Sequence, residues 1–323
     1  MSIPIRSVRS AFRTEAVVDW MTLEIEVERP TQFQWIQDTL TVHYGDGGRP
    51  YVDALDAGAG HSATRFKVRL NDQHCRSLSI IYAALDTLDR KYKLVRPATI
   101  DTLEVALDFY SNGARGDKVL NMVARLQTSL AAYGRSHRQV GANRRPVFLD
   151  SSDKLDPRVT FYVNNKNDPV AWRVYHKTVD RKQDLPPDQH RARAEFTLRT
   201  NELRKHGIYT LEDLGENGFS SFGEYLHFRQ FHPVHDLIFG KDKVITYALA
   251  HGTRHDRNAI ALYPFGRYRY RKDMRTRQPR NAGRPEPLKH SSHTLADKEL
   301  NHIVRDRLHD LSQRFLKKLE AKQ

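Results

Sequence analysis

The sequence predicts an α+β protein, because segments with the two-residue period of half-buried strands alternate with segments of helical spacing. Residues 19–28 place Met21, Leu23, Ile25 and Val27 on one face and polar residues on the other, and residues 65–70 repeat this strand pattern. Residues 31–40 and 77–92 instead space their apolar residues as amphipathic helices do. Strands and helices are therefore mixed along the chain.

Length and composition indicate a folded chain. Its 323 residues are 39% hydrophobic and 10% aromatic, which is enough to fill a core, so global disorder is excluded. No apolar run approaches the roughly 18 residues that cross a bilayer, and no hydrophobic leader opens the chain, so we expect no membrane partner. The single cysteine, Cys75, excludes an internal disulfide and fits a reducing cytoplasm, where we expect the protein to act.

Positive charge is concentrated near the end of the chain. The whole sequence has 53 Lys and Arg against 39 Asp and Glu, a net charge of +14, whereas residues 241–323 alone have 20 against nine. The densest stretch, residues 267–289, has nine basic and two acidic residues, with Tyr268 and Tyr270 between arginines. A polyanion partner is the simplest explanation, and a basic solvated linker is the alternative.

The elements between and after these segments complete the predicted order. A third strand ends at residues 113–116, a helix follows over 118–133, and residues 134–145 read as a basic loop. Near the end of the chain, Thr294 is a candidate cap for a helix whose apolar stripe runs from Leu300 to Leu319. This stripe must be covered, either by the rest of the chain, which we favour, or by a second copy.

Three further strands carry the chemically informative residues. In residues 102–110 the apolar side chains share one face, so Glu104 and Asp108 share the other, about 13 Å apart along the strand. Residues 171–178 and 191–199 follow the same rule, and their polar faces carry Arg173, Tyr175, Lys177, Arg193 and Glu195. If these strands are neighbours with their polar faces together, carboxylates, a tyrosine and several cations meet on one surface.

Such a surface is suited to phosphodiester chemistry. Tyrosine can attack a phosphodiester and conserve its bond energy in a phosphotyrosine, but its pKa near 10 requires neighbouring cations such as Lys177. Carboxylates suit Mg²⁺ or Mn²⁺, which prefer oxygen ligands and clamp phosphoryl oxygens. The alternative is that the three strands are only amphipathic and carry salt bridges on a solvated sheet.

Three segments in this order resemble a known family. They are the acidic strand 102–110, the run Trp-Arg-Val-Tyr-His-Lys at 172–177, and the run Arg-Ala-Arg-Ala-Glu-Phe-Thr-Leu-Arg at 191–199. This order resembles the rolling-circle replication initiators of the filamentous-phage gene II/X family and the related Rep_trans plasmid initiators. The resemblance covers roughly residues 15–240. It implies an antiparallel sheet backed by helices, resembling the HUH-like nuclease fold, with a basic C-terminal extension.

The resemblance also implies roles for individual residues. It places the nucleophile at Tyr175, with Lys177 and Arg173 beside it, and the Mg²⁺ or Mn²⁺ ligands at Glu104, Asp108 and Glu195. Tyr162, on a preceding strand, is the backup nucleophile. The expected DNA-binding residues are Arg193, Arg267, Tyr268, Arg269, Tyr270, Arg271, Lys272, Arg275 and Arg277. Many related enzymes hold their metal with a His-apolar-His motif, and the sequence has no such motif; its nearest pair is His232 and His235.

The implied function is initiation of rolling-circle DNA replication. Residues 1–240 would nick one strand at the origin and later rejoin strands, and residues 241–323 would bind DNA. The implied partners are origin DNA in single- and double-stranded form, a host helicase and a host polymerase, and a homodimer stays open. The alternatives are a conjugative or mobilisation relaxase of similar chemistry and a non-catalytic DNA-binding repressor.

Overall fold

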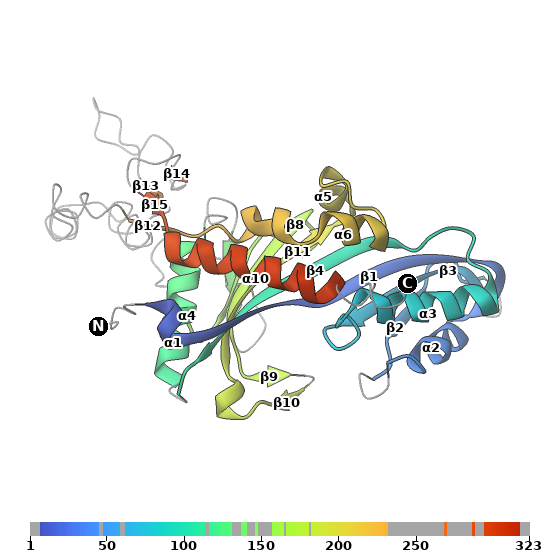
Figure 1. Cartoon of the computed structure of the whole chain (residues 1–323), viewed down its shortest axis with the longest axis horizontal. Helices are drawn as coiled ribbons and strands as arrows, with labels where there is room; N and C mark the ends of the chain where they lie inside the picture. The colour runs from blue at the N-terminus through green and yellow to red at the C-terminus, as the bar shows by residue number, and fades with distance from the viewer. Residues whose placement is uncertain are drawn as a thin grey trace, which may run out of the picture.

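A nine-stranded antiparallel sheet organises the computed structural model (Figure 1). The structure describes residues 7–44, 48–58, 62–113, 116–130, 137–140, 146–147, 157–164, 166–180, 182–231, 268–269, 286–287 and 294–316. The strand order is β2-β3-β1-β4-β11-β8-β7-β5-β6. These strands are β1 (Phe12–Gln32), β2 (Tyr51–Ala54), β3 (Ser62–Asn71), β4 (Thr99–Ser111), β5 (His137–Val140), β6 (Pro146–Val147), β7 (Thr160–Val163), β8 (Val170–Lys177) and β11 (Arg191–Arg199). With its helices, this sheet confirms the α+β class.

Helices and three separate two-stranded sheets accompany the nine-stranded sheet. The helices are α1 (Val8–Ala11), α2 (Phe33–Thr41), α3 (Leu78–Tyr92), α4 (Gly116–Ser129), α5 (Thr200–Lys205), α6 (Leu211–Asn217), α10 (Lys298–Leu316), and the 3₁₀ helices η3 (Pro187–Gln189) and η4 (Ser220–Leu226). The pairs are β9 (Val179–Asp180) with β10 (Gln183–Asp184), β12 (Arg229–Phe231) with β15 (Thr294–Ala296), and β13 (Tyr268–Arg269) with β14 (Glu286–Pro287). None of the described helices is long and apolar enough to cross a membrane.

One face of the central strands is apolar and lies under a helical layer. Helix α4 packs on β4, β8 and β11, while η4 packs on β11 through Phe196, whose ring stacks on Tyr225 with centroids 5.5 Å apart. Helix α10 packs on β1 and η4, and Figure 1 shows it running across the strands. The opposite face of β1, β4, β11 and β8 is therefore the one that carries polar side chains, as the alternation predicts.

The terminal helix α10 is part of this body. Its side chains Leu300, Val304, Leu308 and Phe315 are buried in the same core as the sheet. As far as the structure describes the stripe, up to Phe315, the rest of the chain covers it, as favoured above, while Leu319 lies outside the described residues. The predicted boundary at residue 240 falls outside the described residues, and α10 itself belongs to the core of the first part.

Two local predictions need correction. The segment predicted as a basic loop contains β5, which pairs with β7 and extends the sheet. The cap of α10 is Asp297 and not Thr294, because Asp297 Oδ1 accepts the amide hydrogen of Leu300 at 3.1 Å while Thr294 lies in β15. The capping residue is three positions later than predicted because the chain is still extended at Thr294.

Replacing Asp297 by Ala is expected to destabilise the fold by about 2 kcal/mol. The buried carboxylate caps α10 and also accepts from Arg125 Nη2 at 2.8 Å, so it joins α10 to α4. Urea unfolding measures the loss. Asp297→Asn is the matched control, since it keeps the cap and weakens only the ion pair. A loss below about 0.5 kcal/mol for the Ala variant would contradict this role.

Candidate active site on the polar face of the sheet

Four adjacent strands build a cluster of charged side chains on the polar face. In the register of β11, Arg193 lies opposite Asp108 of β4 on one side and Tyr175 of β8 on the other. Glu195 lies opposite Ala106 and Arg173. Since Ala106 has only a methyl side chain, it leaves the space beside Glu195 to longer groups. The condition set by the sequence reasoning, that these three strands are neighbours, is met by the order β4-β11-β8.

Three carboxylates form a group that could hold a metal ion. Within the described residues, oxygens of Asp19, Glu104 and Glu195 lie within 4.8 Å of one another. Glu195 is 1% exposed and Asp19 is 7% exposed, so this acid group lies beneath the surface of the sheet face. Two members, Glu104 and Glu195, are residues that the sequence predicts as metal ligands.

Asp19 is the member that sequence reasoning missed, and a β-bulge explains why. Val18 pairs with Val105 and Trp20 pairs with Glu104, so Asp19 is an extra residue in β1. Strict alternation would put Asp19 on the same face as Met21. The bulge changes the phase and turns Asp19 to the polar face beside Glu104. Burial shows the change of phase, because the buried apolar residues are Ala16 and Val18 before the bulge and Met21 and Leu23 after it; the sequence does not show it, because Val17 and Trp20 are apolar too.

Asp108, the third predicted ligand, lies outside this group and binds arginines instead. Arg193 donates to both of its oxygens, Nε to Oδ1 and Nη2 to Oδ2, each at 2.6 Å, and Arg191 Nε lies 3.1 Å from Oδ2. The structure therefore does not bring Asp108 together with Glu104 and Glu195. The 13 Å rise between positions 104 and 108 leaves room for a guanidinium between them.

Arg193, predicted to contact DNA, is buried in the site. It is 1% exposed, and its guanidinium binds Asp108 and also Asp19. An arginine so enclosed is positioned to hold two carboxylates and not to meet a ligand from solvent. Its burial follows from the long polar side chains on the neighbouring strands, which cover one another.

Tyr175 reaches the acid group through a hydrogen bond. Its hydroxyl donates to Glu195 Oε2 at 3.0 Å. Burial raises the pKa of Tyr175 well above its usual value, and the charge of Glu195 raises it further, against the effect of Arg193. The phenol is therefore protonated at neutral pH, and an attack by its oxygen requires removal of the proton.

Two more predicted residues, Arg173 and Lys177, line the same face. Arg173 binds Glu195 and donates from Nη2 to Glu104 Oε2 at 3.0 Å. Lys177 Nζ lies 3.0 Å from Asp180 Oδ1 and 3.9 Å from Asp19 Oδ1. Both cations compensate the buried carboxylates, so the cluster balances acids with bases.

The carboxyl groups differ in how they ionise. Burial and, after it, the charge of Glu195 raise the pKa of Glu104 to about 7, against the opposite effect of Arg173. Burial likewise raises the pKa of Glu195, although Arg173 lowers it. For Asp19, burial is outweighed by Arg193 and Lys177, so its pKa is lowered. Closely spaced carboxylates that resist joint ionisation are suited to a divalent cation.

Stability without metal is expected to fall as the pH rises from about 5 to 8. Folded Glu104 has a pKa of about 7, whereas an unfolded Glu titrates near 4.3. Between these values the folded state holds a proton that the unfolded state has released, so raising the pH favours unfolding. Glu104→Gln cannot ionise and should remove this part of the slope in urea unfolding with a chelator. Parallel pH profiles of the two proteins would contradict the assignment.

The remaining predicted residues are only partly described. Tyr162 lies in β7 opposite Arg173, so it shares the polar face one strand from Tyr175. Tyr268 and Arg269 form β13. Arg267, Tyr270, Arg271, Lys272, Arg275 and Arg277 lie outside the described residues, as do His232 and His235.

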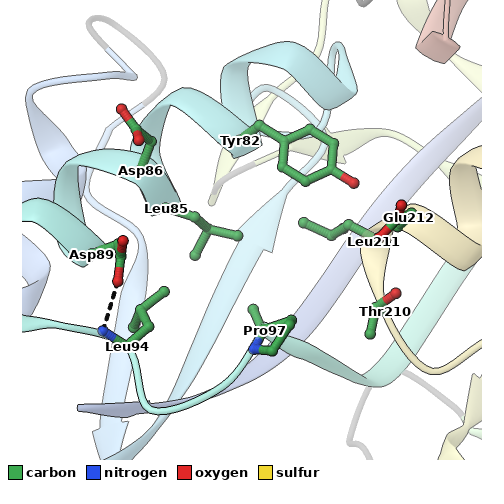
Figure 2. A pocket seen from close by; sticks show the side chains of 10 residues that line it. Tyr82, Leu85, Asp86, Asp89, Leu94, Pro97, Thr210, Leu211 and Glu212 are labelled. Atoms are coloured by element: carbon green, nitrogen blue, oxygen red, sulfur yellow. Dashed lines mark hydrogen bonds between the residues drawn. The ribbon is translucent and has the colours of Figure 1, made fainter. Parts of the chain in front are cut away.

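A separate pocket lies between α3 and α6 (Figure 2). Its volume is about 290 Å³, and Leu85, Pro97 and Leu211 line it with acidic residues that include Glu212. None of its lining residues belongs to the cluster on the sheet face. Although it is a recess large enough for a side chain, it offers no part of the chemistry described above.

The fold and this cluster define a class of site: a buried tyrosine beside acids that could hold a metal, on the polar face of an antiparallel sheet. A solved structure similar to this chain is the rolling-circle replication initiator protein from Geobacillus stearothermophilus. The similarity has a TM-score of 0.32 and 14% identity, and it covers 60% of this chain and 77% of that one. At these values it does not establish a family or a function. No family model matches the sequence, and no curated protein does.

Proposed function

We propose that the protein initiates rolling-circle DNA replication by nicking one strand at an origin through a 5′-phosphotyrosine on Tyr175. The observation that supports this best is the hydrogen bond from Tyr175 to Glu195, a carboxylate that belongs to the acid group with Glu104 and Asp19. A nucleophile, its proton acceptor and a metal-type donor set therefore share one sheet face. Their order in the sequence resembles that of the initiators.

The chain's own residues divide the reaction between them. As the Tyr175 oxygen forms a bond to phosphorus, its proton passes to Glu195 Oε2, which already accepts it at 3.0 Å. The bond from phosphorus to the 3′ oxygen breaks, and that oxygen takes a proton from solvent and becomes the primer end. Because the phosphoester energy is conserved on Tyr175, attack by a 3′ hydroxyl reverses the step and rejoins strands.

The donor set fits Mg²⁺ or Mn²⁺. Its members are three carboxylates, which hard divalent ions prefer, and burial raises the pKa of Glu104 and of Glu195, so a bound cation would favour their ionised forms. We assign Asp19, Glu104 and Glu195 as the ligands, so Asp19 replaces Asp108 in the predicted set. A bound ion would neutralise charge on the phosphate under attack.

Positioning of the DNA falls to the cations in this proposal. Lys177 stands on the strand of Tyr175 and offsets negative charge near it. Residues 267–289 supply sequence-independent phosphate contacts, which makes residues 241–293 the DNA-binding extension. A host helicase and polymerase would then act on the nicked origin.

The decisive experiment is to incubate the protein with supercoiled DNA from its own gene neighbourhood and Mg²⁺ or Mn²⁺. We expect nicked circles and protein attached to the 5′ end, both abolished by a chelator. Peptide mass spectrometry should find the phosphodiester on the peptide that contains Tyr175. Attachment at Tyr162 would move the nucleophile by one strand. Tight, salt-sensitive binding without any cleavage would overturn the proposal in favour of a repressor.

A further inference from the structure

Arg173 occupies the carboxylates that the proposed metal ion would need. Its guanidinium contacts Glu195 Oε1 and lies 3.0 Å from Glu104 Oε2, so it bridges two members of the acid group. The other oxygen of Glu195 accepts from Tyr175. Glu195 therefore has both oxygens engaged before any ion arrives. An ion that binds Glu104 and Glu195 must displace or weaken the bridge from Arg173.

Among the cations that contact the acid group, Arg173 has the most freedom to leave. Its side chain is 33% exposed, whereas that of Arg193 is 1% exposed and that of Lys177 is 9% exposed. Arg193 is also held by Asp108 through two hydrogen bonds. Within the part of the chain that the structure describes, the hydrogen bonds and ion pairs of Arg173 all go to Glu104 and Glu195, so release from these carboxylates frees its guanidinium.

The position of Tyr175 determines where the released Arg173 guanidinium would move. The Arg173 guanidinium carbon lies 6.0 Å from the centre of the Tyr175 ring, on the same face of β8. A phosphate attacked by Tyr175 must come within bonding distance of the Tyr175 oxygen. A guanidinium beside that position can donate two parallel hydrogen bonds to a phosphate, which a lysine cannot do.

We infer that Arg173 is an exchangeable internal cation, which holds Glu104 and Glu195 when no metal is bound and transfers to the DNA phosphate when the metal replaces it. This inference rests on the proposed metal site. Metal and DNA then bind cooperatively, because the ion releases Arg173 for the phosphate and the phosphate draws Arg173 away from the carboxylates. Such coupling is reciprocal, so DNA must tighten metal binding by the same factor by which metal tightens DNA binding.

The test measures Mn²⁺ affinity by electron paramagnetic resonance of the free ion, in the full-length Tyr175→Phe protein, so that no cleavage intervenes. We expect a 20-nucleotide single strand of mixed sequence to tighten Mn²⁺ binding by about tenfold, after subtraction of Mn²⁺ bound by the strand alone. Adding Arg173→Gln should tighten Mn²⁺ binding without DNA by about tenfold and abolish the effect of the strand.

The matched control is Arg69→Gln. Arg69 is exposed, stacks over Trp20 and lowers the pKa of Glu104 through its charge, without a hydrogen bond to Asp19, Glu104 or Glu195. The Arg69→Gln substitution removes the same charge without removing a bridge between carboxylates, so the single-stranded DNA should still tighten Mn²⁺ binding. If Arg173→Gln does not fold, Arg173→Lys replaces it, because lysine keeps the charge but lacks the planar guanidinium that bridges two carboxylates. The Arg173→Lys protein should then bind Mn²⁺ severalfold more tightly than the parent protein.

The outcomes separate the two proposals. The exchange is overturned, and the proposed metal site is not, if Mn²⁺ binding is unchanged or weaker in the Arg173 variants. The same holds if single-stranded DNA still tightens Mn²⁺ binding in these variants. Absence of Mn²⁺ binding in the parent protein overturns the metal site and the exchange together. Loss of Mn²⁺ binding in Glu195→Gln, with tighter binding in Arg173→Gln, supports both.

Discussion

Tyr175→Phe is expected to abolish strand nicking and the covalent protein–DNA product, with a rate loss of at least about 10³-fold. The substitution removes one oxygen, which is the atom that would attack phosphorus and which now donates to Glu195 Oε2 at 3.0 Å. The aromatic ring stays on β8, so the fold should lose only about 1 kcal/mol. Nicking of supercoiled DNA and gel-shift binding of the same DNA are the measurements.

The matched control is Tyr162→Phe. Tyr162 lies on the same face of the sheet, one strand away and opposite Arg173. We expect its variant to nick at a rate close to that of the wild type. Both variants should bind DNA as the parent does. Nicking that survives in Tyr175→Phe and disappears in Tyr162→Phe would reverse the assignment, and survival in both would contradict Tyr175 and Tyr162 alike as the required nucleophile.

Arg193→Met is expected to lower the free energy of unfolding by about 3–5 kcal/mol. Arg193 is 1% exposed, donates twice to Asp108 at 2.6 Å and also binds Asp19. Methionine fills much of the same volume, but the buried carboxylates of Asp108 and Asp19 lose the positive charge that offsets theirs. This uncompensated negative charge causes the loss of stability. Urea unfolding at pH 7 measures it.

Arg90→Met provides the comparison, since Arg90 pairs with Asp86 at 3.0 Å while both side chains are largely exposed. An ion pair of that kind contributes about 0–1 kcal/mol, so its loss should be small. Adding Asp108→Asn to Arg193→Met should restore part of the stability, because it removes one of the stranded charges. Equal losses for Arg193→Met and Arg90→Met would contradict the role of Arg193.

Alternation along strands predicted most of the site. It placed Glu104 on one face of its strand and Tyr175 with Arg173 and Lys177 on one face of theirs, because the pleat repeats every two residues without reference to the rest of the fold. The structure then brings these strands side by side. Periodicity says which residues share a face. It does not say which strands are neighbours, so that remained a condition until the structure gave the strand order.

Two properties of the site were beyond this reasoning. Alternation does not tell which of two acids on one face meets a metal and which meets an arginine, so Glu104 and Asp108 were treated alike. It also does not report burial of a polar face, so Arg193 was expected at a DNA surface although four strands of long side chains enclose it. Both depend on residues far apart in the sequence, through the register of β4 and β11.

The bulge at Asp19 makes the two halves of β1 opposite in parity. Before it, even-numbered residues such as Ala16 and Val18 face the helical layer; after it, odd-numbered residues such as Met21 and Leu23 do. Deleting either Asp19 or Trp20 would merge the two halves into one regular strand and leave a single residue opposite Glu104. The strand pairing in the core would be kept. The acid group would lose the carboxylate of Asp19 in one case and its orientation toward the polar face in the other. The proposed site thus depends on the length of β1, and we expect a single-residue deletion at this point to affect the acid group more than the core.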